Sequence, residues 1–83
     1  MTSDYTDFFK SLGRRIRELR ENAAYSKHDM VSLGFSARQW QQIEAGRPIT
    51  VVTLLRICEI FEIESDDLLR GLSKKVHIPF VAN

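Results

Sequence analysis

The sequence of 83 residues predicts an all-α domain built from five helices. Apolar residues recur at the three- and four-residue spacing of a helix, a helix-start signal appears repeatedly, and glycines follow several of the periodic stretches. The expected helices span residues 4–22, 26–33, 36–45, 50–61 and 65–71. Only residues 76–81 alternate in a way that would suit a strand.

The first helix is indicated by its apolar spacing, and the next two are indicated by how they start. The apolar positions of the first helix are Tyr5, Phe8, Phe9, Leu12, Ile16 and Leu19. Ser26 followed by Asp29 forms a capping box, and Tyr25 and Met30 flank it as a hydrophobic staple. The third helix repeats both signals, with Ser36 and Gln39 as the box and Phe35 and Trp40 as the staple.

The last two helices carry similar signals. Thr50 is the expected N-cap of one helix and Ser65 that of the other. Two acids, Asp66 and Asp67, would be favourable near the positive end of the last helix. The second, third and fifth helices are expected to end at Gly34, Gly46 and Gly71.

The second and third helices are separated only by Gly34 and Phe35 before the Ser36 cap. Glycine suits such a turn because it adopts a left-handed backbone conformation easily. Two short helices joined in this way are a helix-turn-helix, whose second helix enters the major groove of DNA. The sequence therefore predicts a DNA-binding motif over these two helices.

The predicted third helix has a core side and a polar side. At about 100° per residue, Ile43 and Glu44 share one side with Trp40, which is expected to be a core residue. The opposite side carries Arg38, Gln42 and Ala45, with Gln41 and Ala37 at its flank. Arginine pairs with guanine and glutamine with adenine, so this side is the candidate base-reading surface. Helical periodicity alone is also compatible with an ordinary solvent-facing side that binds nothing, since Arg and Gln also favour helices. Gln39 is assigned to capping first and to DNA only second.

Five pieces of sequence, in order and at nearly the right spacing, resemble the lambda-repressor and Cro-like, or XRE-type, helix-turn-helix family. They are residues 12–20, 34–36, 43–46, 53–57 and 65–69, so the resemblance runs from Leu12 to Leu69. It implies a compact five-helix lambda-repressor-like domain that binds double-stranded DNA.

The resemblance also implies roles for individual residues. Ala37, Arg38 and Gln42 match base-contacting positions, and Lys27 matches a phosphate-contacting position that is usually glutamine. We expect Arg47 to be a second phosphate anchor at the other edge of the motif. An arginine late in the first helix of this family pairs with the glutamate that ends the third. Here these residues are Arg20 and Glu44, an ion pair interpreted as structural.

Two departures from the family pattern affect how the motif would dock. The segments 26–34 and 46–54 each look one residue shorter than usual, so the second helix or its turn is expected to be altered. Ala37 cannot hydrogen-bond a base and can only pack against a thymine methyl group. Specificity would therefore rest on fewer side chains than usual.

Charge is unevenly distributed along the chain, although the net charge is only +1. Residues 10–47 contain eight Lys or Arg against four Asp or Glu, whereas residues 48–83 contain four against five. A basic first part and an acidic last part of the chain would orient the protein as it approaches a polyanion. Charge alone is equally compatible with an ordinary solvated surface.

Signals for other function classes are missing from the sequence. Cys58, the single cysteine, lies at helical spacing with apolar residues, so a buried core thiol in a reducing compartment is expected. No metal-ligand spacing, phosphate-binding glycine loop or catalytic triad occurs, so no cofactor, metal, catalytic residue or small-molecule substrate is expected. No apolar run reaches membrane-span length and no leader opens the chain, so a cytoplasmic protein is expected.

The chain is expected to divide into a DNA-binding domain over residues 1–73 and a tail over residues 74–83. The end of the chain is rich in apolar residues, which would suit a homodimer interface. Its expected members are Leu68, Leu69, Leu72, Ile78 and Phe80. A tail that folds back on its own chain or stays disordered is the alternative.

Two functions of different classes follow from this reading. The first is a sequence-specific transcription regulator, dimeric on a palindromic operator, because a monomer of this size reads few bases. The second is a protein-interaction adaptor, or an antitoxin-like binder of a protein partner, that keeps the fold but reads DNA weakly. Ala37, the near-neutral net charge and the acidic stretch 59–67 motivate the second. An enzyme is not expected.

Overall fold

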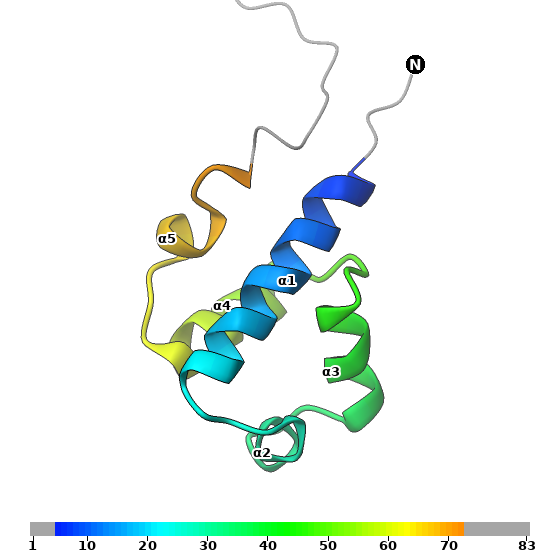
Figure 1. Cartoon of the computed structure of the whole chain (residues 1–83), viewed down its shortest axis with the longest axis vertical. Helices are drawn as coiled ribbons and strands as arrows, with labels where there is room; N and C mark the ends of the chain where they lie inside the picture. The colour runs from blue at the N-terminus through cyan, green and yellow to red at the C-terminus, as the bar shows by residue number, and fades with distance from the viewer. Residues whose placement is uncertain (1–4, 73–83) are drawn as a thin grey trace, which may run out of the picture.

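Short turns join five helices in the part of the chain that the computed structural model describes, residues 5–72 (Figure 1). The helices are α1 (Thr6–Asn22), α2 (Lys27–Ser32), α3 (Ala37–Glu44), α4 (Val51–Phe61) and α5 (Ser65–Leu69). No strand occurs within these residues. The all-α prediction is confirmed, and the alternating stretch 76–81 lies outside the described residues. In Figure 1, α3 and α5 lie on opposite sides of α1.

Three of the predicted N-caps are present. The Ser26 hydroxyl accepts a hydrogen bond from the Asp29 amide at 3.0 Å, and the Asp29 carboxylate accepts one from the Ser26 amide at 2.7 Å. These two bonds complete the capping box of α2 and hold the pKa of Asp29 below its usual value. Ser36 caps α3 and Thr50 caps α4, each through a hydrogen bond to the backbone three residues later.

The predicted cap of α5 is wrong by one residue. Glu64, which has an extended backbone, is the N-cap and makes no side-chain capping bond. Its carbonyl already accepts hydrogen bonds from the amides of Asp67 and Leu68, so Ser65 is the first helical residue. The cap position is set by where the backbone turns helical, which a serine in the sequence does not decide alone.

Two glycines end helices in backbone conformations that other residues rarely adopt. Gly34 has φ +110° after α2, and Gly46 has φ +91° after α3. Both follow their helices as the sequence predicted, because glycine reaches positive φ without the steric cost of a side chain. The α2–α3 turn and the α3–α4 connection therefore begin at these two residues.

One apolar core holds the helices together. Its buried members are Leu12, Ile16, Met30, Phe35, Trp40, Ile43, Ile57, Cys58, Leu68 and Leu72. Trp40 is 1% exposed, which confirms it as a core residue. Cys58 is buried as expected, and burial raises the pKa of its thiol.

The C-terminal end of the described chain packs into the same core. Leu68 is 0% exposed and Leu72 is 3% exposed within a single chain. Expecting these two side chains to face a partner was therefore wrong, because their apolar surface is already buried by the chain's own helices. The Arg15 guanidinium of α1 also donates hydrogen bonds to the carbonyls of Leu68 and Arg70, at 2.9 and 2.7 Å. These bonds connect α1 to the end of α5.

Close packing of α1 against α3 depends on Gly13. A methyl group at this position would lie 2.8 Å from the carbonyl oxygens of Ile43 and Glu44. Gly13 is buried, and only a residue without a side chain permits this approach. The end of α3 therefore lies directly against the backbone of α1.

Candidate nucleic-acid interface

The turn between α2 and α3 is held by an aromatic anchor. Phe35 is 1% exposed, and its ring lies 5.0 Å from the Trp40 ring in an edge-to-face arrangement. This contact is the hydrophobic staple predicted around the Ser36 cap. It fixes the angle at which the chain enters α3.

Arg56 of α4 holds the same turn from the other side, and the sequence did not predict this role. Its guanidinium lies 4.4 Å from the centre of the Phe35 ring and donates a hydrogen bond to the Gly34 carbonyl at 3.3 Å. A cation over an aromatic face is stabilising. The one available signal was that Arg56 is the only basic residue in an apolar helix.

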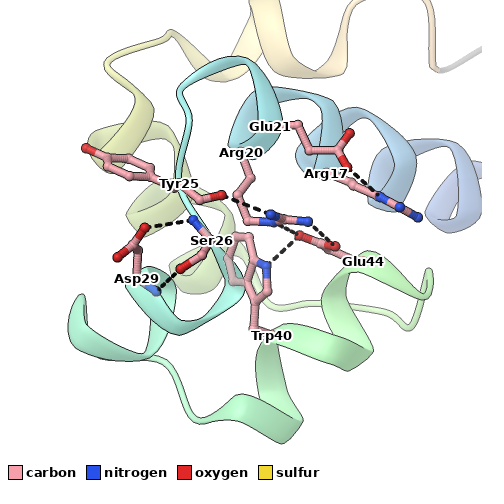
Figure 2. Close-up of polar contacts among 8 residues, drawn as sticks. All are labelled: Arg17, Arg20, Glu21, Tyr25, Ser26, Asp29, Trp40 and Glu44. Atoms are coloured by element: carbon pink, nitrogen blue, oxygen red, sulfur yellow. Dashed lines mark hydrogen bonds and ion pairs between the residues drawn. The ribbon is translucent and has the colours of Figure 1, made fainter.

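Arg20 and Glu44 form the buried pair that the resemblance implies. The Arg20 Nε and Nη2 atoms donate to the two carboxylate oxygens of Glu44 at 2.6 and 3.3 Å (Figure 2). Only 9% of the Arg20 side chain and 6% of the Glu44 side chain are exposed. The hydrogen bond that Arg20 donates to the Glu44 carboxylate outweighs burial and raises the pKa of Arg20.

Two further hydrogen bonds extend this pair into a junction. Arg20 Nη1 donates to the Tyr25 carbonyl at 2.9 Å, and the Trp40 indole Nε1 donates to the Glu44 carboxylate at 2.5 Å. Figure 2 shows the side chains of Arg20, Trp40 and Glu44 and the Tyr25 carbonyl converging between α1, the chain entering α2, and α3. These bonds fix how α3 is rotated about its own axis. They therefore also determine which of its residues face away from the core.

The opposite side of α3 carries exposed polar residues. A shallow, open hollow is lined by Arg38, Gln41, Gln42, Ala45 and Arg47. The structure thus brings three of the four predicted base-reading residues together with Arg47, one of the predicted phosphate contacts. Ala37, the fourth, lies next to them in a groove that it shares with Gln41 and with Lys27 at the start of α2.

Gln39 occupies the predicted capping position, but within residues 5–72 its side chain makes no hydrogen bond with the Ser36 amide, so only one half of the predicted capping box is present. Gln39 is half-buried, and its backbone amide donates to the Ser36 hydroxyl at 2.9 Å. Its side chain lines a groove between α3 and the start of α4, together with Gln42 and Arg47. This groove adjoins the exposed side of α3.

Residues 11–72 match the family model for the helix-turn-helix domain. The chain belongs to this family. Searches of curated proteins and of solved structures found no match to the chain. Helix-turn-helix domains bind DNA, so family membership indicates a DNA-binding protein. The two helices of the motif are α2 and α3, as the sequence predicted.

Basic residues on this face of the helix-turn-helix domain have no acidic partner among the described residues. The ion pairs within residues 5–72 are Arg17–Glu21, Arg20–Glu44 and Arg70–Asp67. Lys27, Arg38 and Arg47 take part in none of them. Their charges are therefore available to phosphate groups.

Acidic residues gather elsewhere on the domain. A hollow at the end of α4 and the start of α5 is lined by Glu59, Glu62, Glu64 and Asp67, with Leu55, Cys58, Ile63 and Ser65. Because α5 lies across α1 from α3 (Figure 1), α5 and α3 occupy opposite sides of the domain. This separation would favour one orientation toward a polyanion.

The remaining predicted site residues are not brought together. Leu68 and Leu72 belong to the core, Leu69 is half-buried, and Ile78 and Phe80 lie outside the described residues.

In residues 5–72, no cluster of three or more His, Cys, Asp or Glu side chains could hold a metal ion. None of the helices described here has the length and apolar character to cross a membrane.

Proposed function

We propose that this helix-turn-helix domain is a transcription regulator that reads a specific duplex DNA sequence with α3 in the major groove. The observation that carries the proposal is the two-sided environment of α3. Its core side is fixed by Gly13, Trp40 and the Arg20–Glu44 pair, and its other side presents Arg38, Gln41 and Gln42 in one hollow. A rigid helix with bidentate donors on its free side suits direct base readout.

Base recognition would use three side chains and one small residue. Arg38 would donate to the O6 and N7 atoms of a guanine, and Gln42 would pair with an adenine about one helical turn further along. Gln41 would contact a neighbouring base. Ala37 would pack against a thymine methyl group, since it has no hydrogen-bonding side chain.

Phosphate contacts would flank the base contacts. Lys27 is exposed at the first position of α2, and Arg47 is exposed three residues after the end of α3. The two would bind the sugar–phosphate backbone on either side of the groove, with Gln39 as a secondary contact. Such contacts position the protein without reading sequence.

A dimer on a palindromic operator would supply the specificity that one small domain lacks. Two copies would place their recognition helices about 34 Å apart, one turn of DNA. Leu69 remains partly available for this contact, with Ile78 and Phe80 as the other proposed members. Sedimentation of the full chain and of a version ending at Ser73 tests the proposal. A full chain that is monomeric at micromolar concentration would exclude a preformed dimer and leave pairing on DNA.

The proposed function is tested by a DNA-binding titration. The purified protein is titrated with the duplex upstream of its own gene and with a scrambled duplex of the same composition, each at several salt concentrations. Specific regulation predicts tighter binding to one palindromic site, at least about 10³-fold above the scrambled duplex, and affinity that falls with salt. Equal, salt-sensitive binding to both duplexes would contradict sequence-specific readout.

The acidic hollow at the end of α4 favours a second candidate, an adaptor that binds a protein partner. Four carboxylates and two exposed or half-buried apolar side chains, Leu55 and Ile63, line it. An adaptor would bind DNA weakly or not at all, so the same titration separates the two functions. Binding that ignores both sequence and salt would favour the adaptor.

A further inference from the structure

A groove outside the recognition surface lies between the start of α1 and the connection that follows α3. Tyr5, Phe9 and Lys10 line it from one side, and Gly46, Arg47 and Pro48 from the other. None of these α1 residues was among the predicted DNA contacts. Tyr5 is 48% exposed and Lys10 is exposed, whereas Phe9 is half-buried against the core.

Gly46 fixes the two sides of this groove against each other. A methyl group on Gly46 would lie 2.8 Å from the Cα atom of Lys10, so the backbones of α1 and the connection are in direct contact. Gly46 also has φ +91°, which turns the chain sharply after α3. Lys10 and Arg47 are therefore held on one groove by backbone packing.

The groove is positively charged. Among residues 5–72, Lys10 and Arg47 line it, no carboxylate does, and neither cation is in an ion pair. Asp7 lies on the same turn of α1 but does not line the groove. An anion entering here meets two free cations and the hydroxyl of an exposed tyrosine.

The groove is continuous with the proposed base-reading surface. Ala45 and Arg47 line both this groove and the hollow that contains Arg38, Gln41 and Gln42. A DNA strand that leaves the recognition helix past Arg47 would therefore reach Lys10 next. Its phosphate groups are the anions that these residues would meet.

We propose that this groove binds the sugar–phosphate backbone of the duplex beyond the base pairs read by α3. Lys10 and Arg47 bind successive phosphate groups, and the Tyr5 hydroxyl donates a hydrogen bond to a phosphate oxygen. The proposal rests on the proposed function, because it lengthens the DNA footprint of the same protein. It adds Lys10 and Tyr5 to the residues that determine affinity without changing sequence preference.

The experiment compares four proteins on the specific duplex over a range of salt concentrations. In Lys10→Gln, the slope of log affinity against log salt should become shallower by about 0.9, the value for one phosphate contact. Between 50 and 200 mM salt the variant should therefore lose about 3.5-fold less affinity than the wild type. Lys10→Arg should restore the wild-type slope. Arg70→Gln, which removes an exposed charge directly after α5, is the matched control and should leave the slope unchanged.

Tyr5→Phe separates the hydroxyl from the charge. Loss of one hydrogen bond to a charged phosphate oxygen should lower affinity by about 10-fold or more at every salt concentration, with the slope unchanged. Ethylation of individual phosphates gives an independent measurement, which with the wild type alone does not depend on any variant folding. Ethylation just outside the base pairs that α3 reads should block wild-type binding and should not further weaken Lys10→Gln.

The outcomes distinguish this inference from the proposed function. If the wild type binds its site specifically but shows no ethylation interference outside the read base pairs, the groove does not bind DNA. An unchanged slope in Lys10→Gln would overturn the inference in the same way while leaving the proposed function intact. A wild-type protein that discriminates no duplex would contradict the proposed function itself.

Discussion

The Arg20 guanidinium and the Glu44 carboxylate are joined by two hydrogen bonds, 24 residues apart in the chain, and more than nine-tenths of each side chain is buried. This pair connects the late part of α1 to the last residue of the recognition helix. Because Trp40 donates to the same carboxylate, Glu44 has partners on two helices. The pair therefore helps to hold α3 in a fixed position against α1 and the core.

Removing one member of this pair should be costly. Arg20→Ala leaves the Glu44 carboxylate buried without its cation, so the free energy of unfolding should fall by about 3–5 kcal/mol. Arg20→Ala combined with Glu44→Ala should cost less than the sum of the two single changes. Urea unfolding followed by Trp40 fluorescence measures all three. Additive costs would show that the two side chains do not interact in solution.

Gly13→Ala should destabilise the protein even though alanine favours helices. Alanine gains about 1 kcal/mol of helix propensity over glycine at an exposed position. Here the added methyl group would meet two carbonyl oxygens at 2.8 Å, and overpacking of this kind costs about 1–3 kcal/mol or more. Thermal unfolding should show a lower midpoint than wild type. Glu18→Ala, an exposed change on the same helix, is the control and should stay within about 0.5 kcal/mol of wild type.

Arg38→Ala should relax sequence preference at one operator position. Loss of a bidentate arginine–guanine contact should cost about 1–3 kcal/mol of specific affinity and little on a scrambled duplex. Gln42→Ala should do the same at a neighbouring base pair. Binding to a set of single-base operator variants measures both effects. A variant that keeps the wild-type preference would place the recognition surface elsewhere on the domain.

Lys27→Ala and Arg47→Ala should weaken binding to all sequences alike. Each change should make the slope of log affinity against log salt shallower by about 0.9 per lost phosphate contact. The ratio of specific to scrambled binding should stay the same. Titrations at four or more salt concentrations measure the slope, and an unchanged slope would mean that the side chain does not reach the DNA backbone.

The capping box of α2 should make stability depend on pH in the acid range. Folding lowers the pKa of Asp29 through its hydrogen bonds with Ser26, so the folded state binds this proton less readily than the unfolded state. The carboxylate therefore adds stability above the unfolded pKa of about 4, and this contribution is lost as pH falls through the lower, folded pKa.

Asp29→Asn tests this dependence. The variant should be less stable than wild type at pH 7, and the difference should shrink as pH falls below about 4. Ser26→Ala should cost about 1 kcal/mol at pH 7, because it removes the hydroxyl that caps the helix. Urea unfolding at a series of pH values measures both. A difference between Asp29→Asn and wild type that is constant with pH would contradict the assignment.

Features that depend on neighbours in the chain were predictable from the sequence. Ser26, Ser36 and Thr50 each cap a helix through a bond to a residue three positions later, so the signal lies within a few letters of sequence. The exposed side of α3 was equally predictable, since helical periodicity assigns residues to sides. The start of α5 was not, because the extended backbone of Glu64 moved the cap one residue earlier.

Features that depend on distant parts of the chain were missed. Leu68 and Leu72 are apolar whether they face a partner or the protein's own core, and only the folded structure shows that they are buried. Arg56 meets Phe35 from another helix, 21 positions away, so no local pattern predicts their contact. Lys10 reaches the surface beside Arg47 only because α1 packs against Gly46.

The two hydrogen bonds from Arg15 to the carbonyls of Leu68 and Arg70 have a consequence for the order in which the chain is made. During synthesis α1 leaves the ribosome first, but its guanidinium partners are translated more than fifty residues later. The helix-turn-helix itself is complete by residue 44, well before these partners exist. Nascent chains that end before residue 68 therefore contain both helices of the helix-turn-helix on an unfinished domain, and the bonds from Arg15 form only after α5 has been translated.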